Sequence, residues 1–193
     1  MNRIHNEAAN RYQRAVGVVE KYQKKLPNGK YAKNAFISDF YTHFAYATQA
    51  HAIDLAAKEE ENPSYENHEL LIKRLQQSKQ GFEKNHNRSV NDEYYYACTL
   101  QMLAQYDDPS YFTSFFRALA EVEKNADHLD KGIISDLYLK IGEAYEFVYG
   151  VKKNEKKAVQ YIKRAGKAGR ICACHAGKYV CRLGEYELSS DNV

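Results

Sequence analysis

Cysteine and histidine side chains near the C-terminal end of the chain have the types, though not the spacing, of a zinc site. Cys172, Cys174, His175 and Cys181 are close together in the sequence, and thiolates and imidazoles are the usual zinc ligands. On one helix, however, Cys172 and Cys174 would point about 200° apart, so they could not bind one ion unless the helix unwound. We therefore predict no metal centre here. We expect these cysteines and Cys98 to be thiols, with disulfides as the less favoured alternative.

Two further groups of histidines also fall short of a metal site. His68 and Glu69 begin a pattern like that of zinc proteases, but Ile72 occupies the position of its second histidine. His43 and His51 would lie two turns apart on a helix, or roughly 12 Å, which is too far for one ion. We expect His43 and His51 to lie on a surface or in a groove.

No combination of residues in the sequence points to catalysis. Gly29-Lys30 lacks the upstream glycine and the following Ser or Thr of a phosphate-binding loop, and no nucleophile elbow is present. The carboxylates of Asp107 and Asp108 lie at an expected turn, where capping of the backbone explains them. The sequence therefore predicts a protein that is not an enzyme and has no cofactor and no small-molecule substrate.

Charge is distributed unevenly along the chain, although the formal net charge is only +3. Residues 91–136 contain nine acidic and three basic residues, whereas residues 150–182 contain ten basic residues and one acidic residue. A net charge this small does not by itself indicate nucleic acid. Binding of nucleic acid or of an anionic membrane through the basic region is the alternative function. We favour a solvated helix face as the explanation of the lysines.

The sequence contains no segment typical of membrane insertion or secretion. No stretch approaches the roughly 18 to 20 apolar residues that a membrane span requires, and residues 1–10 lack the apolar centre of a signal peptide. We therefore expect a cytoplasmic protein, or a periplasmic one if a leader has been removed.

Helical periodicity along the chain predicts an all-α fold. Only three prolines and ten glycines are present, which are too few turn-forming residues for a β-rich fold of this size. Apolar residues recur at helical spacing, as in Phe112, Phe115, Phe116 and Leu119. The predicted helices cover residues 2–25, 32–58, 65–84 and 90–106, then a helix starting at Pro109, and three helices containing residues 134–148, 158–165 and 170–185.

Residues 141–169, with the sequence IGEAYEFVYGVKKNEKKAVQYIKRAGKAG, have the pattern of one helical hairpin. Small residues would let the two helices approach closely, Tyr145 would fill the space between them, and Gly150 would supply a bend that a Cβ hinders. The small residues are Gly142, Ala158 and Ala165, and Asn154 is the expected N-cap of the second helix. This segment resembles a Sel-one-like repeat, the α-solenoid relative of the tetratricopeptide repeat.

The resemblance implies a right-handed α-solenoid of about four antiparallel helix pairs. We expect one domain over residues 1–188, with divergent helices in 1–89, Sel-one-like repeats in 90–188 and a frayed tail in 189–193. Residues 102–106 look like a degenerate copy, in which Leu103 replaces the family's glycine. Proteins similar to this are adaptors and scaffolds, and bacterial ones include immunity proteins against secreted toxins.

We predict a protein partner, such as a bacterial toxin or effector, in a shallow groove formed by the first helix of each pair. The three tyrosines 94–96 would span about 200° of a helix, so at least one of them is expected at the surface. Tyr95 suits a buried stripe with Cys98 and Met102, which leaves Tyr94 as the exposed anchor. The predicted partner-binding residues form two stripes, which are Tyr94, Gln101 and Gln105, and then Asp136, Lys140, Glu143 and Phe147.

Overall fold

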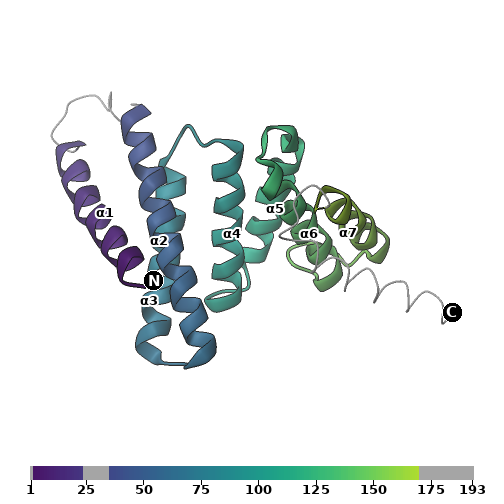
Figure 1. Ribbon diagram of the computed structural model, residues 1–193, viewed down its shortest axis with the longest axis horizontal. Helices are drawn as coiled ribbons and strands as arrows, with labels where there is room; N and C mark the ends of the chain where they lie inside the picture. The colour runs from purple at the N-terminus through teal and green to yellow at the C-terminus, as the bar shows by residue number, and fades with distance from the viewer. Residues whose placement is uncertain (1, 24–34, 170–193) are drawn as a thin grey trace. The chain divides into compact units, whose positions relative to one another are not determined.

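The computed structural model describes residues 2–23 and 35–169, and all regular structure in these ranges is helical. The helices are drawn in Figure 1 and are α1 (Asn2–Gln23), α2 (Ala35–Glu61), α3 (Tyr65–Lys84), α4 (Val90–Tyr106), α5 (Tyr111–Lys124), a short 3-10 turn (Ala126–His128), α6 (Lys131–Phe147) and α7 (Glu155–Gly169). The prediction of an all-α chain is therefore confirmed for this part of the protein. The eighth predicted helix, over residues 170–185, lies outside the described residues.

Capping residues explain why α3 and α4 have the predicted bounds. The Ser64 hydroxyl accepts a hydrogen bond from the Asn67 amide at the start of α3. At the start of α4, Ser89 and Asp92 form a reciprocal capping box, in which each side chain bonds the other residue's amide. The predicted start of α5 at Pro109 is wrong, because the helix begins at Tyr111.

The chain divides into two compact units after Pro109, with α1 to α4 in the first and α5 to α7 in the second. In the first unit α1 packs against α2, α2 against α3 and α3 against α4 (Figure 1). In the second unit α6 packs mainly against α7 and also contacts α5. The boundary between the units falls inside the segment predicted to hold Sel-one-like repeats.

Aromatic and aliphatic side chains join the helices of the first unit. Val16 of α1 packs against Tyr41 and Phe44 of α2, and all three are buried. Leu75 and Phe82 on α3 have no exposed surface. Complete burial of such a side chain contributes about 1.5 to 3 kcal/mol relative to leaving it in water, so these contacts account for much of the cohesion of α1, α2 and α3.

The buried face of α4 differs from the predicted one. Tyr94, Ala97 and Leu103 are buried, whereas Cys98 and Met102 are only half-buried. The prediction that Tyr94 is exposed is therefore wrong, since only 5% of its surface is accessible. Helix α4 carries apolar residues on nearly all sides, so the spacing of these residues does not indicate which face is buried.

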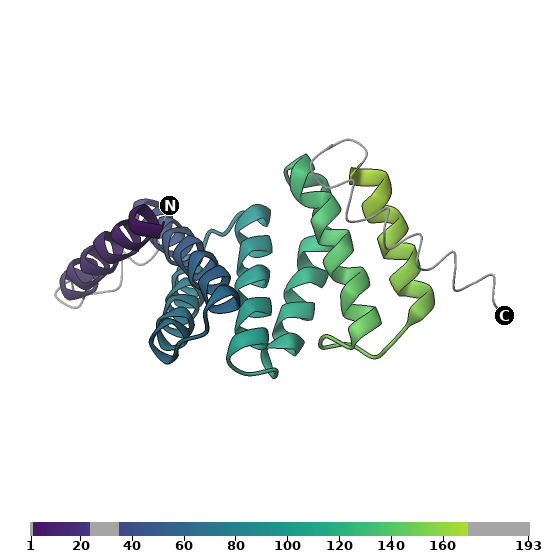
Figure 2. The same cartoon turned by 60° about the horizontal axis from the view of Figure 1, so that its bottom comes forward.

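Helices α6 and α7 form a close antiparallel hairpin, seen side by side in Figure 2. A Cβ added to Gly142 on α6 would lie 2.9 Å from Ile162 Cγ1 and 3.2 Å from the Ala158 carbonyl oxygen on α7. Ala158 and Ala165 are fully buried. The predicted role of Gly142 as a point of close helix approach is confirmed.

Replacing Gly142 with leucine should destabilise the protein by about 3 kcal/mol, because the added side chain overpacks this crossing. Equilibrium unfolding in urea, followed by circular dichroism, measures the change. Gly132→Leu on the same helix is the matched control, because a Cβ at Gly132 meets no atom within 4 Å. Equal effects of the two substitutions would show that the helix crossing does not depend on Gly142.

Candidate functional site

The predicted stripe on α6 lies along one side of that helix and ends in an exposed aromatic ring. Asp136 and Lys140 form an ion pair at 3.7 Å along the helix, and both are half-buried, as is Glu143. Phe147, the last residue of α6, has 45% of its surface exposed. This stripe therefore combines charged groups with an accessible apolar group, which is the composition of many protein interfaces.

The predicted stripe on α4 has a different character, because its aromatic member is buried. Tyr94 lies inside the molecule, Gln101 is half-buried and Gln105 is exposed. The α4 and α6 stripes belong to different units, so we describe each separately. Only the α6 stripe presents an aromatic anchor at the surface.

The turn between α6 and α7 is held in one conformation by backbone bonds and stacked rings. The amides of Val148 and Tyr149 both donate to the Ala144 carbonyl, the pattern that ends many helices in a left-handed residue. Val148 is that residue, with φ 64° and ψ 32°, and Gly150 also has a positive φ of 71°. The Tyr149 ring stacks on Phe112 of α5, with centroids 4.3 Å apart.

Lysine side chains lie in this turn and at the start of α7. Lys152, Lys153 and Lys156 are exposed, and Lys153 pairs with Glu155 at 2.8 Å. Lys157 lies over the Tyr145 ring, 5.0 Å from its centroid. The predicted N-cap of α7 is confirmed, because the Lys157 amide donates to Asn154 Oδ1 at 3.0 Å.

An arginine and a carboxylate order the aromatic side chains between α5, α6 and α7. The Arg164 guanidinium lies over the rings of Tyr138 and Tyr161 and pairs with Glu123 at 2.8 Å. The Tyr161 hydroxyl donates to Glu123 at 3.0 Å. Burial and this carboxylate raise the pKa of Tyr161 to about 12, so its hydroxyl remains a hydrogen-bond donor at neutral pH.

A buried arginine with hydrogen bonds to several side chains joins α1, α2 and α3. Arg74 is 4% exposed, and its Nε donates to His51 Nδ1 at 3.0 Å. Its terminal nitrogens donate to Gln77 at 2.9 Å and to the side-chain oxygens of Asn6 and Asn10 at 3.3 and 2.5 Å. A buried charge requires such compensation, so this cluster holds α1 against the other two helices.

Stability should fall as the pH drops below about 6.5, because His51 is neutral in this cluster. Burial, and next the Arg74 charge, lower the pKa of His51 below its ordinary 6.5. Lys58 and His5 act in the same direction, and Asp54 opposes them.

Because the pKa of His51 is lower in the folded chain, the unfolded chain binds a proton at His51 more readily. The free energy of unfolding therefore decreases as the pH falls from 6.5 to the pKa of His51 in the folded chain. Urea unfolding at pH 7.5 and 5.5 measures this loss of stability. His51→Gln, which keeps an acceptor but does not titrate, should show a smaller difference between the two pH values. Equal differences in both proteins would exclude His51 as the cause.

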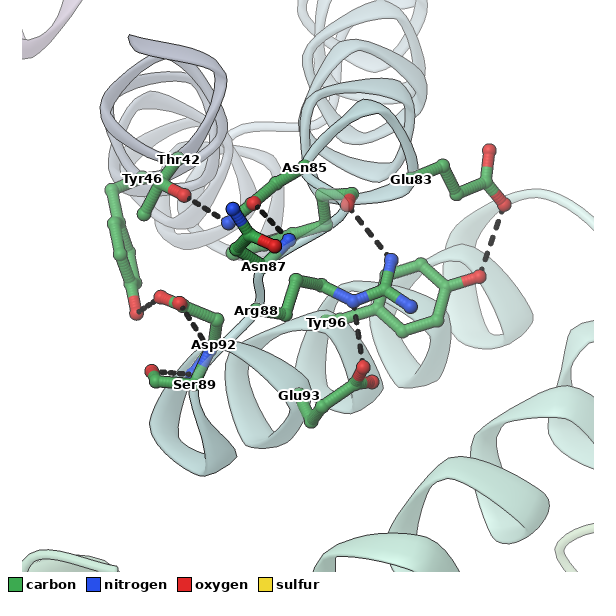
Figure 3. A network of polar contacts seen from close by, with 11 residues as sticks. Thr42, Tyr46, Glu83, Asn85, Asn87, Arg88, Ser89, Asp92, Glu93 and Tyr96 are labelled. Atoms are coloured by element: carbon green, nitrogen blue, oxygen red, sulfur yellow. Dashed lines mark hydrogen bonds and ion pairs between the residues drawn. The ribbon is translucent and has the colours of Figure 1, made fainter. Parts of the chain in front are cut away.

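A second polar network ties α4 to α2 and α3 at the α3–α4 turn (Figure 3). The Tyr46 hydroxyl on α2 donates to Asp92 at 2.7 Å, and Arg88 donates to the Phe82 carbonyl at 2.8 Å. The Tyr96 hydroxyl donates to Glu83 at 3.0 Å, and burial together with that carboxylate raises the pKa of Tyr96. These groups form hydrogen bonds with one another, so the network has a structural role in holding the helices together.

The first unit also presents an open apolar hollow of about 490 Å³. It lies along α1, where Ile4 is 72% exposed, and it reaches Phe40 on α2. Glu7 and Arg11 place opposite charges at its lining. This hollow is an alternative surface on which a partner could bind.

Within the described ranges, no three His, Cys, Asp or Glu side chains are grouped so that they could hold a metal ion. Cys98 is a half-buried thiol. The predicted absence of zinc at Cys172, Cys174, His175 and Cys181 concerns residues outside those ranges. That prediction therefore remains a prediction.

Two residues have surroundings that the sequence did not indicate. Val148, expected inside the helix containing residues 134–148, instead follows the last residue of α6 and is 55% exposed. For Arg74 the sequence gives no indication of burial other than its place directly before the apolar Leu75.

None of the described helices is long and apolar enough to cross a membrane. No family model, curated protein or solved structure matches the chain.

Proposed function

We propose that this chain is a non-enzymatic protein-binding module, an adaptor or inhibitor built from Sel-one-like helix pairs stacked as a right-handed α-solenoid. Its partner is one specific protein, and a secreted bacterial toxin or effector is the class that the resemblance suggests. The observation that carries the proposal is the α6–α7 hairpin. Gly142 meets α7 as the repeat pattern requires, Gly150 has a positive φ, and Asn154 caps α7.

The surface of α6 supports the same function. Phe147 offers an exposed aromatic ring, and aromatic residues are enriched among the side chains that dominate interface energies. The Asp136–Lys140 pair lies on the same helix and can provide directional polar contacts. Charged groups at the rim of an interface mainly affect the rate of association and the choice of partner.

Phe147→Ala should weaken the complex by more than about 1 kcal/mol, or roughly fivefold. The partner is first identified by affinity capture from the native organism and crosslinking, and its dissociation constant is then measured by calorimetry. The variant should keep the helical spectrum of the wild type, because Phe147 ends α6 and is half exposed. Tyr94→Ala is not a suitable test, since loss of a buried ring would also destabilise the fold.

Two controls separate the α6 surface from other surfaces. Swapping Asp136 and Lys140 for each other keeps their ion pair while exchanging its ends, so it should alter the association rate more than the stability. Ile4→Ser at the α1 hollow should leave binding unchanged. A partner that loses affinity only with Ile4→Ser would move the site to α1, and turnover of a small-molecule substrate would contradict the whole proposal.

A further inference from the structure

Val148 has a backbone conformation that its side chain disfavours. Among the described residues it is the non-glycine residue with a positive φ. A β-branched side chain at φ 64° is a genuine outlier, because the Cβ crowds the neighbouring carbonyl oxygen. Such strain persists only where the surrounding structure imposes it, and it is concentrated at functional sites.

The contacts of the turn explain the conformation but not the choice of valine. The Val148 and Tyr149 amides bond the Ala144 carbonyl, and the Asn154 amide bonds the Tyr145 carbonyl at 3.0 Å. Glycine at residue 148 would make the same backbone bonds without strain. The valine side chain is 55% exposed, so core packing does not account for it either.

The turn that begins at Val148 combines exposed apolar side chains with exposed lysines. Phe147 precedes it with 45% of its surface exposed. Residues 148–157 include four lysines and a single acid, Glu155. The pair between Lys153 and Glu155 lies at the surface, with the two side chains 58% and 71% exposed. Exposed pairs of this kind contribute little stability, so Lys153 can exchange Glu155 for a carboxylate of a partner.

We infer that the surface at the α6–α7 turn, formed by Phe147, Val148 and the exposed Lys152, Lys153 and Lys156, is a docking surface for an acidic peptide segment of a partner protein that carries apolar side chains. This inference rests on the proposed protein-binding function and names the chemistry of the partner. The two apolar residues receive the partner's apolar side chains, and the lysines pair with its carboxylates. Charge complementarity of this kind selects the partner and speeds its association.

Nucleic acid has the same charge as an acidic peptide but fits the apolar residues of this surface less well. Nucleic-acid sites use aromatic faces on which bases stack. Phe147 offers a single exposed ring, because one face of Tyr149 is covered by Phe112 in a nearly parallel stack and Val148 has no ring. An aliphatic group next to an aromatic one suits the apolar side chains of a peptide instead.

A library of random 12-residue peptides displayed on phage tests this inference on the full chain. Peptides are selected on the wild-type protein and counter-selected on Phe147→Ser. We expect enrichment of sequences that combine Asp or Glu with at least two Leu, Ile or Phe residues. A synthetic peptide from the enriched group then serves as the probe for affinity measurements.

Val148→Gly should have opposite effects on binding and on stability. Binding of the peptide should weaken at least tenfold, while the thermal midpoint should rise by about 2 to 4 °C because the strain is relieved. Val148→Ala should weaken binding similarly without that rise, which separates the side chain from the backbone. Ile53→Ala changes an apolar residue of α2 that is 54% exposed and should leave binding unchanged.

Several outcomes would overturn the inference. They are the absence of enriched peptides, enrichment of basic peptides, and binding that survives both Phe147→Ser and Val148→Gly. Binding of phosphatidylserine vesicles or of a 20-nucleotide DNA that is lost in these variants, without peptide binding, would assign the surface to a membrane or a nucleic acid. A native partner that crosslinks elsewhere on the chain would refute this surface and leave the proposed protein-binding function intact. A chain that binds no protein would refute that function itself.

Discussion

Gly150→Ala is expected to destabilise the protein by about 3 kcal/mol or more. Two effects add at this position. A Cβ would come within 2.1 Å of the Phe112 carbonyl oxygen, a backbone atom of α5, and residue 150 has a φ of 71° that disfavours any side chain. The clash cannot be relieved by a rotamer change, so α5 and the α6–α7 turn would have to separate.

Urea unfolding followed by circular dichroism measures the loss. Gly132→Ala is the matched control, because a Cβ there meets nothing within 4 Å and lies in the first turn of α6. Alanine at that site should be neutral or should stabilise by up to about 1 kcal/mol. If Gly150→Ala behaved like Gly132→Ala, the turn would not pack against Phe112 as the structure shows.

Arg74→Met is expected to destabilise the first unit by about 3 kcal/mol, even though methionine is apolar and similar in length. The guanidinium donates to four side chains at once, those of His51, Gln77, Asn6 and Asn10. Methionine would leave their acceptor atoms without hydrogen bonds inside the protein, and each unsatisfied buried group costs about 1 to 3 kcal/mol before relaxation.

Hydrogen exchange gives the sharper test, because Arg74 bonds two residues of α1 directly. Amides of α1 should exchange faster in Arg74→Met, while those of α7 in the second unit should keep their wild-type protection. Lys73→Met removes the exposed cation next to Arg74 on the same helix and should change the stability by less than about 0.5 kcal/mol. Unaltered protection of α1 would show that the cluster does not hold that helix in place.

Local signals in the sequence were sufficient to place several elements. Ser64 and Ser89 cap the helices that follow them, and the predicted bounds of these two helices, residues 65–84 and 90–106, are confirmed. Gly142 and Gly150 were singled out for close approach and for a bend, and both roles are confirmed. Each of these predictions depends on the residue itself or on partners a few positions away in the chain.

The candidate site was only partly predictable. Phe147 was expected at the surface and is exposed, whereas Tyr94 was expected there and is buried. The two predictions differ in outcome because α6 ends at Phe147, while α4 is apolar on nearly every side. A helix of that kind leaves the choice of its buried face to the helices that pack around it.

The amino-acid sequence by itself determined that the described part of the chain is helical, where α3 and α4 begin and end, and that α6 and α7 form a close pair. Periodicity, caps and small residues act over a few residues, so they are readable without coordinates. Only the tertiary structure decided that Arg74 is buried among neutral side chains from three helices, and that Val148 takes a left-handed conformation at the surface. Both depend on groups brought together by packing between helices, and spacing along the chain does not report such packing.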